Sequence, residues 1–269
     1  MTRIACVQLA PVLGDLAGNL ASSTAAISTA VAAGADVIVL PELVTSGYML
    51  ADAEEARSVA LRPTAEDFAE WIGAAGNSVV IGGFCELGDD GDGDDLLYNS
   101  AVVVDAGGVL EHYRKTHLWD REKLLFTPGD KLPAVLQTRH GVIAVMVCYD
   151  LEFPELTRRA VLDGAELIAA PVNWPLFPRP AGEHPGEVIT AMSTARTNKV
   201  AVVACDRAGV ERGQPWTEGS VVISPDGWVV AEVGPGAGMA IADVDLSATR
   251  DKSVTEYVHL LADRRVDLY

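Results

Sequence analysis

Hydrophobic residues along the chain follow two different spacings in turn. Short, nearly continuous apolar runs are typical of strands buried on both faces of a sheet. Stretches in which apolar residues recur every three or four positions are typical of helices that bury one side. The apolar runs, and therefore the predicted strands, cover residues 4–9, 37–40, 79–84, 101–104, 142–147, 167–170, 200–205, 221–223 and 239–244.

The predicted helices lie between these strands. The first follows Asn19, a residue type that caps helix N-termini, and it ends at Gly34. The second opens at residues 64–67, and two more cover residues 155–163 and 186–198. Strands and helices alternate to the end of the chain without a linker rich in Pro, Gly or Ser. The pattern therefore predicts a single α/β domain over residues 1–269.

Two segments of the chain resemble each other. Residues 34–41 are Gly-Ala-Asp-Val-Ile-Val-Leu-Pro, and residues 164–171 are Gly-Ala-Glu-Leu-Ile-Ala-Ala-Pro. Each combines a helix end, a tight turn, a buried strand and a proline that stops the strand. The similarity suggests two related halves, with sheet packed on sheet and helices outside. A chance likeness between two common strand–turn patterns is an equal alternative.

Composition narrows the class of protein. Hydrophobic residues make up 49% of the 269 positions and charged residues 22%, which allows a sizeable core and excludes wholesale disorder. Lys and Arg number 20 against 38 Asp and Glu, for a net charge of −18. A surface this acidic argues against nucleic acid and anionic membranes as partners. No apolar run approaches the roughly 18 residues that a membrane span needs.

The cysteines and the N-terminus indicate a reduced compartment. The chain enters a strand-like pattern at once and shows no signal-peptide plan. Its cysteines lie far apart without a C-x-x-C pair, so neither a disulfide framework nor a thiolate metal cluster is expected. We therefore predict a cytoplasmic protein. The four cysteines are Cys6, Cys85, Cys148 and Cys205.

The acidic stretch 88–95 has some likeness to a calcium-binding loop. Asp90, Asp92 and Asp94 alternate as in an EF-hand. The required glycine and bidentate glutamate of that loop would fall on Asp95 and Ala101, so the match fails. A solvated hairpin loop is predicted instead.

Three residues near the ends of predicted strands could perform chemistry together. Cys148 follows the strand 142–147, at a turn where a nucleophile is exposed and backbone N–H groups can hold an oxyanion. Glu42 follows the strand 37–40, where poor solvation raises a carboxyl pKa toward that of a general base. Lys115 is the third. Taken singly, a small buried cysteine, a surface glutamate and a solvated lysine are the ordinary alternatives.

With their flanking residues, these three positions resemble the Glu-Lys-Cys triad of the nitrilase superfamily of carbon–nitrogen hydrolases. The matching motifs are Leu-Pro-Glu at 40–42, Tyr-Arg-Lys-x-His-Leu at 113–118 and Val-Cys-Tyr-Asp-x-x-Phe-Pro-Glu at 147–155. Residues 122–129, beginning with Glu122, are similar to the segment that bears the family's second glutamate. The resemblance spans essentially the whole chain, although residues 194–198 follow the family pattern only loosely.

The resemblance implies a fold, a reaction and an assembly. The fold is a four-layer α-β-β-α sandwich, and the reaction is hydrolysis of a small linear amide to acid and ammonia, with no metal or organic cofactor. Glu42 is the implied base and Cys148 the nucleophile that forms a thioester. Lys115 and the backbone N–H of Tyr149 would stabilise the oxyanion, while Glu122 holds Lys115. A homodimer or higher homo-oligomer is also implied, with a tail from about residue 250 to 269 that crosses to the partner subunit.

The residue pattern after the nucleophile bears on the substrate. Superfamily members that act on carboxylate-bearing substrates commonly carry an Arg three or four positions after the cysteine, where this chain has Leu151 and Glu152. A carboxylate there repels an acidic substrate and attracts an ammonium group. We therefore predict a preference for neutral or amine-bearing amides, and the likeness is to amidases that act on aminoamides. The alternative is that Glu152 pairs within the fold with Arg158 or Arg159.

Six residues on the loops around Cys148 are predicted to bind substrate. They are Tyr48, Trp119, Tyr149, Glu152, Asn173 and Trp174.

Other functions are open alternatives. An N-carbamoyl amine hydrolase of the carbamoylputrescine type comes first, and an ω-amidase or a nitrilase is less favoured. Nitrilases usually show Cys-Trp-Glu where this chain has Cys-Tyr-Asp. A redox thiol protein would need a resolving cysteine near Cys148. A non-catalytic scaffold would have no physical reason to keep the charged cluster.

Overall fold

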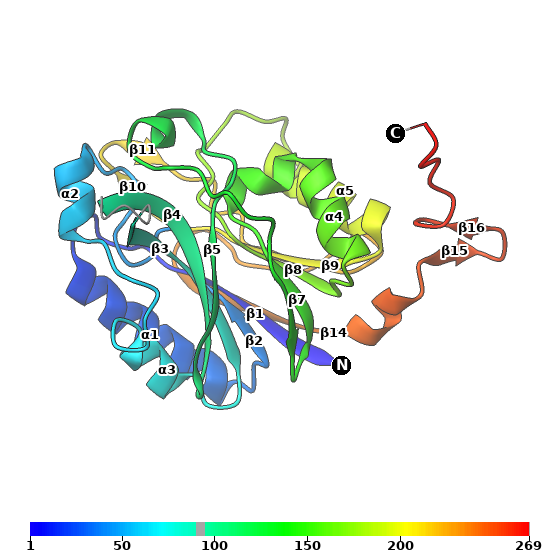
Figure 1. Ribbon diagram of the computed structural model, residues 1–269, viewed down its shortest axis with the longest axis horizontal. Coiled ribbons are helices and arrows are strands. Elements are labelled where there is room, and N and C mark those ends of the chain that lie inside the picture. Colours follow the sequence, from blue (N-terminus) through cyan, green and yellow to red (C-terminus); the bar gives the residue numbers. More distant parts are fainter. Residues whose placement is uncertain (90–94, 269) are drawn as a thin grey trace.

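Two six-stranded sheets lie face to face within the described residues, and helices cover the outer side of each sheet (Figure 1). The structure is a computed structural model that describes residues 1–89 and 95–268. This arrangement confirms the predicted four-layer α-β-β-α sandwich.

The first sheet has the strand order β14-β1-β2-β3-β4-β5. Strands β1, β2 and β3 are parallel to one another, and the remaining pairings are antiparallel. Its strands are β1 (Thr2–Gln8), β2 (Val37–Val39), β3 (Val79–Asp89), β4 (Asp95–Asp105), β5 (Gly108–Arg114) and β14 (Gly238–Val244).

The second sheet has the order β13-β12-β9-β8-β7-β6 and the same plan. Strands β7, β8 and β9 form its parallel centre, and β6, β12 and β13 join antiparallel at its edges. Its strands are β6 (Val135–Thr138), β7 (Gly141–Val145), β8 (Leu167–Pro171), β9 (Ala201–Cys205), β12 (Val221–Ile223) and β13 (Val229–Glu232).

Helices lie outside the sheets, and short 3₁₀ helices and hairpins lie in the loops. Helices α1 and α3 cover the first sheet, and α4 and α5 cover the second (Figure 1). The helices are α1 (Leu16–Ala32), α2 (Ala53–Ser58), α3 (Ala69–Ala74), α4 (Pro154–Leu162) and α5 (Gly186–Asn198). Within the described residues, 3₁₀ helices cover Asp120–Leu124, Cys148–Glu152 and Leu246–Arg250. One small hairpin pairs β10 (Val210–Glu211) with β11 (Gln214–Pro215), and another pairs β15 (Ser253–Thr255) with β16 (Val258–His259).

The two similar segments occupy equivalent places in the two sheets. Residues 34–41 supply β2 and residues 164–171 supply β8, each in the parallel part of its own sheet. The loops that follow them meet across the sandwich, because the backbone N–H of Glu42 donates to the carbonyl of Val172 at 3.2 Å. The two halves therefore place their strand ends side by side, as sheet-on-sheet packing requires.

Buried apolar side chains of the described residues form three clusters. Between the sheets, residues of the first sheet such as Ile4 and Val39 pack with residues of the second such as Val145 and Val203. On the outer side of the first sheet, Trp71 of α3 is fully buried with residues of α1. Its indole N–H donates to the Ser23 hydroxyl at 2.8 Å, which satisfies the polar atom that this large side chain buries.

The N-cap prediction for the first helix is wrong. The helix begins at Leu16, and Asp15 caps it by accepting from the backbone N–H of Gly18. Asn19 lies inside the first turn, where its buried amide bonds both the N–H and the carbonyl of Val12. A residue type that favours caps serves here to fasten the preceding loop.

Two features relevant to function are absent from the described part of the chain. No three His, Cys, Asp or Glu side chains within it are placed to hold a metal ion. No helix within it is long and apolar enough to cross a membrane. Asp90, Asp92 and Asp94, the basis of the rejected calcium loop, lie outside the described residues, between strands β3 and β4.

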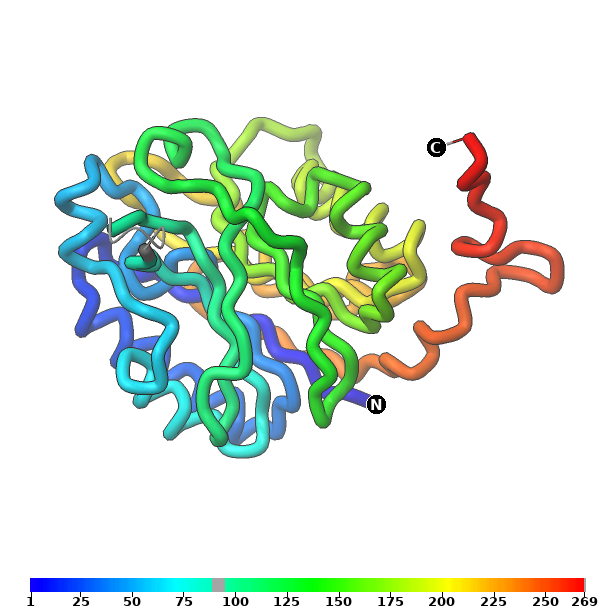
Figure 2. Tube along the Cα trace, viewed as in Figure 1, coloured from blue at the N-terminus to red at the C-terminus, as the bar shows by residue number. Residues whose placement is uncertain are grey.

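The C-terminal segment leaves the body of the molecule (Figure 2). Its start is fastened by two lysines, since Lys252 Nζ donates to the carbonyl of Lys199 and Lys199 Nζ donates to that of Ser253. Beyond this point apolar side chains face solvent, with Tyr257 85% exposed and Val266 69% exposed. Residue 269 lies outside the described residues.

This exposed tail generates a prediction about assembly. Deletion of residues 256–269 should weaken the predicted homodimer, because apolar side chains that face solvent in one subunit are typical of a surface covered by another. Sedimentation velocity of the full and shortened chains at matched concentrations checks this. The tail's role would be contradicted if the shortened chain kept the same sedimentation coefficient, corrected for mass, and a circular dichroism spectrum like that of the full chain.

Candidate active site

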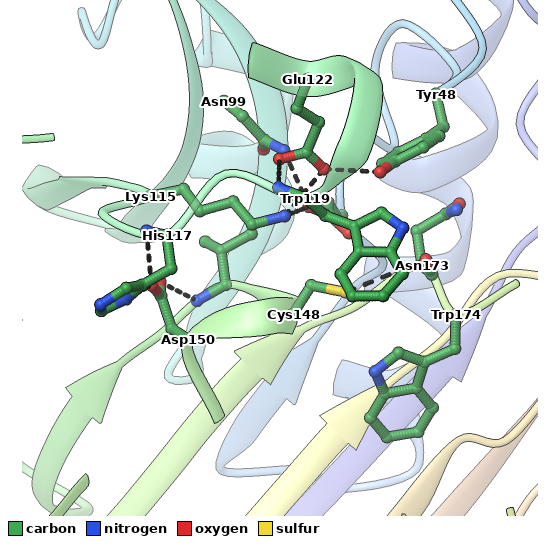
Figure 3. Close-up of polar contacts among 12 residues, drawn as sticks. Tyr48, Asn99, Lys115, His117, Trp119, Glu122, Cys148, Asp150, Asn173 and Trp174 are labelled. Atoms are coloured by element: carbon green, nitrogen blue, oxygen red, sulfur yellow. Dashed lines mark hydrogen bonds and ion pairs between the residues drawn. The ribbon is translucent and has the colours of Figure 1, made fainter. Parts of the chain in front are cut away.

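The predicted catalytic side chains converge from both sheets. Glu42 stands three residues after the end of β2, and Lys115 directly follows β5. Cys148 opens the 3₁₀ helix just beyond β7 in the second sheet. Figure 3 shows Lys115, Glu122 and Cys148 gathered around one space, with Trp119 and Asn173 beside them.

A buried ion triplet forms the centre of the site. Lys115 Nζ lies 2.7 Å from Glu42 Oε1 and 2.8 Å from Glu122 Oε1. Glu42 and Lys115 are fully buried, and Glu122 is 5% exposed. Two carboxylates therefore face one ammonium away from solvent, and the structure brings together three of the four residues that the sequence predicts to be catalytic.

Neutral donors hold the carboxylates in place. Asn99 Nδ2 donates to Glu42 Oε1 at 2.8 Å, and the Tyr48 hydroxyl donates to Glu122 Oε1 at 2.6 Å. The backbone N–H of Trp119 donates to Glu122 Oε2 at 3.0 Å. Glu42 Oε2 has no hydrogen-bond partner, so one oxygen of this buried carboxylate is available to a substrate or to the thiol.

Cys148 occupies a strained backbone position. Its φ is +48°, in the left-handed region that residues with a Cβ rarely adopt. Its Sγ lies 3.9 Å from the carbonyl oxygen of Asn173, and the residue is 7% exposed. Strain of this kind concentrates at functional sites, and here it turns the sulfur toward the loop of the neighbouring strand β8.

Burial and the surrounding charges set the protonation of the base and the thiol. Burial of Glu42 raises its pKa to about 7, with Lys115 opposing the rise and Glu122 adding to it. Burial also raises the pKa of Cys148, the Glu42 carboxylate adds to the rise, and the Lys115 ammonium opposes it. The sulfur is accordingly a neutral thiol that needs a base to become a nucleophile.

Lys115 remains a cation in spite of its burial. Loss of solvation lowers its pKa, but the Glu122 and Glu42 carboxylates outweigh this, so the pKa is raised well above the ordinary lysine value. The pKa of Tyr48 is likewise raised, mainly by burial and then by the charge of Glu122. The site thus holds a fixed ammonium beside a carboxyl group that can take up a proton near neutral pH.

A small cleft opens onto Cys148. Its volume is about 50 Å³, and five of the six predicted substrate-binding residues line it. Tyr48 does not. It lies at an adjoining pocket, and its hydroxyl is committed to Glu122. The lining residues are Trp119, Cys148, Tyr149, Glu152, Asn173, Trp174, Pro175, Phe177 and Glu187.

Unsatisfied polar atoms and aromatic rings characterise the cleft. Asn173 is 1% exposed, yet neither its Nδ2 nor its Oδ1 has a hydrogen-bond partner. Buried amides are normally paired, so this one has donor and acceptor capacity for a ligand. The Trp119 ring meets Tyr149 edge to face at a centroid distance of 4.8 Å, which gives the cleft a rigid apolar wall.

Glu152 shares the cleft wall with a second carboxylate. Partial burial and the nearby charge of Glu187 raise the pKa of Glu152. The structure gives Arg159, one of its suggested internal partners, a different partner, Asp163, at 2.8 Å. The cleft rim is therefore locally negative.

Two residues that contribute to the site, Asn99 and Glu187, were not predicted from the sequence. Asn99 lies in the interior of β4, and Glu187 lies in the first turn of α5. Nothing in their local sequence marks them, because only tertiary packing brings Asn99 to Glu42 across 57 positions of the chain. For Glu187, a missed signal was its place at the start of a correctly predicted helix beside the catalytic loops.

Close backbone packing fixes the Glu42 loop. Gly83 in β3 exchanges hydrogen bonds with this loop, donating to the carbonyl of Pro41 and accepting from the N–H of Val44, both at 3.0 Å. A Cβ at Gly83 would lie 2.4 Å from Leu43 N and 2.5 Å from Glu42 Cα. Only glycine allows the loop to approach β3 this closely.

The chain is similar to known proteins over its whole length. Residues 3–252 match the family described as carbon-nitrogen hydrolase. The chain is 34% identical over 282 residues to a nitrilase of Pyrococcus abyssi, covering 100% of this chain and 99% of that protein. It is 31% identical to an (R)-stereoselective amidase of a Pseudomonas species, covering 99% and 92% of the two chains.

A solved structure shows the same fold. It is a glutamate-to-glutamine mutant of the amidase from Nesterenkonia sp. AN1, with acrylamide joined to its active-site cysteine by Michael addition. The TM-score is 0.80 at 25% sequence identity, and the match covers 100% of this chain and 98% of the other.

The Gly83 contact generates a prediction. Gly83→Ala should lower the turnover of a short amide by about tenfold or more, because displacement of Glu42 by even a fraction of an ångström misaligns the reacting groups. Gly73→Ala is the matched control, since a Cβ there meets nothing within 4 Å. Ammonia release and thermal unfolding of both variants check the effect. Equal turnover by the two variants would show that the Glu42 loop tolerates the shift.

Proposed function

The chain belongs to the carbon-nitrogen hydrolase family, and we propose that this amidase hydrolyses small linear amides with Glu42, Lys115 and Cys148 as its catalytic triad. The observation that carries the proposal is the ion triplet beside Cys148, with Nζ of Lys115 2.7 Å and 2.8 Å from two carboxylates. Maintaining such a buried charged group is costly for folding, so it is expected only where chemistry uses it.

The first half-reaction forms a thioester. Glu42 takes the proton of the Cys148 thiol as Sγ attacks the amide carbon, and the carbonyl oxygen becomes an oxyanion. Lys115 and the backbone N–H of Tyr149 stabilise that oxyanion. The C–N bond then breaks, Glu42 returns the proton to the nitrogen, and ammonia leaves an acyl group on Cys148.

The second half-reaction releases the acid. Water attacks the thioester carbon while Glu42 takes one of its protons, and the C–S bond breaks. The proton returns to Sγ, so the enzyme regains its starting state. Throughout, Glu122 holds the Lys115 ammonium, and Tyr48 and the Trp119 backbone hold Glu122.

The cleft supports a preference for neutral or amine-bearing amides. Glu152 and Glu187 place two carboxylates at the wall of the cleft. These carboxylates attract an ammonium group of a substrate and repel a carboxylate. The free amide of Asn173 can bind the substrate's own amide.

The same negative rim also fits an N-carbamoyl amine. With such a substrate the amine would leave when the C–N bond breaks and the acyl group on Cys148 would be a carbamoyl group, which water would release as carbon dioxide and one ammonia. An ω-amidase fits less well, because its substrate carries a carboxylate. Nitriles are also worth testing as substrates, because the similar protein of Pyrococcus abyssi bears the name nitrilase.

We also propose a cytoplasmic location. All four cysteines are free and buried, which suits a reducing compartment.

The triad generates a prediction about pH and substitution. Because the pKa of Glu42 is about 7 and only its deprotonated form can accept the thiol proton, kcat/KM should fall as the pH drops below that value. Glu42→Gln should abolish activity and, with it, this dependence on pH. Lys115→Ala should reduce kcat by about 100- to 1,000-fold, because an oxyanion donor is lost. Ammonia release between acid and neutral pH measures both. Substantial activity in Cys148→Ala would refute the mechanism.

Substrate charge generates a second prediction. Among amides of equal chain length, an ω-amino amide or a neutral amide should exceed a dicarboxylic mono-amide in kcat/KM. Glu152→Gln should reduce the advantage of the amino amide by about two- to fivefold, as expected for one charge that solvent reaches. Glu155→Gln, an exposed change on the next helix, is the control. Carbon dioxide from N-carbamoyl amines and ammonia from nitriles identify the alternatives, and a clear win for the acidic amide would overturn the preference.

A further inference from the structure

We propose that Asp150 is a positioning residue that aligns Lys115 with Cys148. The inference rests on the proposed function, because it assigns a role within that site. Asp150 lies two positions after Cys148 and is fully buried. Its carboxylate joins the segment that carries Lys115 to the turn that carries the sulfur, although the proposed reaction uses no atom of it.

One carboxylate oxygen joins the nucleophile turn to β5. Asp150 Oδ2 accepts the backbone N–H of Val147 at 3.1 Å and the Tyr113 hydroxyl at 3.0 Å. Val147 immediately precedes Cys148, whose φ of +48° needs support to persist. Tyr113 is two residues before Lys115. A single oxygen atom thus fixes the distance between the two segments.

The other oxygen holds the far side of Lys115. Asp150 Oδ1 accepts the Thr116 hydroxyl at 2.9 Å and the backbone N–H of His117 at 3.0 Å. It also lies 2.8 Å from His117 Nδ1 (Figure 3). Because an ionised carboxylate only accepts, that ring nitrogen carries the hydrogen. Lys115 is therefore bracketed by residues bonded to Asp150 on both sides.

The imidazole is held from its face as well. His117 stacks on Phe153, with ring centroids 3.6 Å apart and planes 13° apart. Phe153 ends the same 3₁₀ turn that Cys148 begins. The two motifs, Tyr-Arg-Lys-x-His-Leu and Cys-Tyr-Asp-x-x-Phe, are thereby packed against each other by side chains that flank the catalytic residues.

The connection between the two segments requires a carboxylate at position 150. Hydrogen bonds to a buried carboxylate are short and strong, and a carboxylate can accept several at once. An asparagine of the same shape would present an amide to donors on one side or the other, so at least one donor would lose its acceptor. The arrangement thus needs aspartate, and its loss should let the Lys115 segment and the Cys148 turn separate.

Reactivity of Cys148 reports this alignment without any substrate. The Lys115 ammonium lowers the pKa of Cys148, so a well-placed ammonium speeds alkylation of the sulfur by iodoacetamide. Peptide mass spectrometry at a series of pH values gives the rate for each cysteine. Cys6, Cys85 and Cys205 are fully buried and react only if a variant unfolds.

The experiment compares variants that do and do not keep the hydrogen bonds. Thr116→Val removes the hydroxyl at constant shape and should slow alkylation of Cys148 by about threefold or more, while Thr116→Ser should restore the normal rate. These two variants leave the charge of Asp150 in place. Asp150→Asn should slow the reaction by about fivefold or more, and Asp163→Asn, directly after the outer helix α4, is the control for a lost carboxylate.

A double-variant cycle tests whether the effect passes through Lys115. In a Lys115→Ala background, Thr116→Val and Asp150→Asn should change the alkylation rate by less than about twofold. Equal slowing in both backgrounds, or no slowing in either single variant, would overturn the proposal. Ammonia release by the parent and by Cys148→Ala tests the proposed function separately, so failure of the one is distinguishable from failure of the other.

Discussion

The burial of one ammonium between two carboxylates is the constraint on which the site depends. An unpaired Lys115 in a fully buried position would cost several kcal/mol, and contact with Glu42 and Glu122 offsets that cost. Burial raises the pKa of Glu42 to about 7, the Lys115 ammonium opposes this rise and the charge of Glu122 adds to it. The two carboxylates therefore keep the lysine charged, while burial keeps one of them able to take and return a proton near neutral pH.

Close backbone contacts convert this electrostatic requirement into a fold requirement. Gly83 lets the Glu42 loop lie directly on β3, and the N–H of Glu42 reaches the carbonyl of Val172 in the loop after β8. Asp150 ties the turn of Cys148 to the segment of Lys115. Glu42 and Lys115 are thus held by backbone hydrogen bonds as well as by their charges, and the neutral Cys148 is held by the backbone of its turn. The face-to-face packing of two similar halves is what brings these loops within reach of one another.

Sequence patterns predicted what depends on local spacing. The buried strand over residues 221–223 and the helix over residues 186–198 have the predicted bounds, and the strand was recognisable because it is a continuous apolar run. The edge strands β5 and β6 escaped prediction, since each mixes polar and apolar residues and is only partly buried. The ion triplet was predicted from motifs. The hydrogen bonds that support the ion triplet were not predictable from the sequence, because Asn99 meets Glu42 only through tertiary packing.

Charge at the cleft shows why local placement outweighs total charge. A net charge of −18 describes the whole surface, but salt screens exposed charges beyond about 8 Å at physiological ionic strength. Glu152 and Glu187 line the cleft itself, so a substrate's ammonium group bound there would lie within that distance of both carboxylates. A chain of equal acidity with neutral residues at these two positions would give an ammonium group little local attraction. The proposed preference therefore rests on two placed carboxylates and not on the composition of the surface.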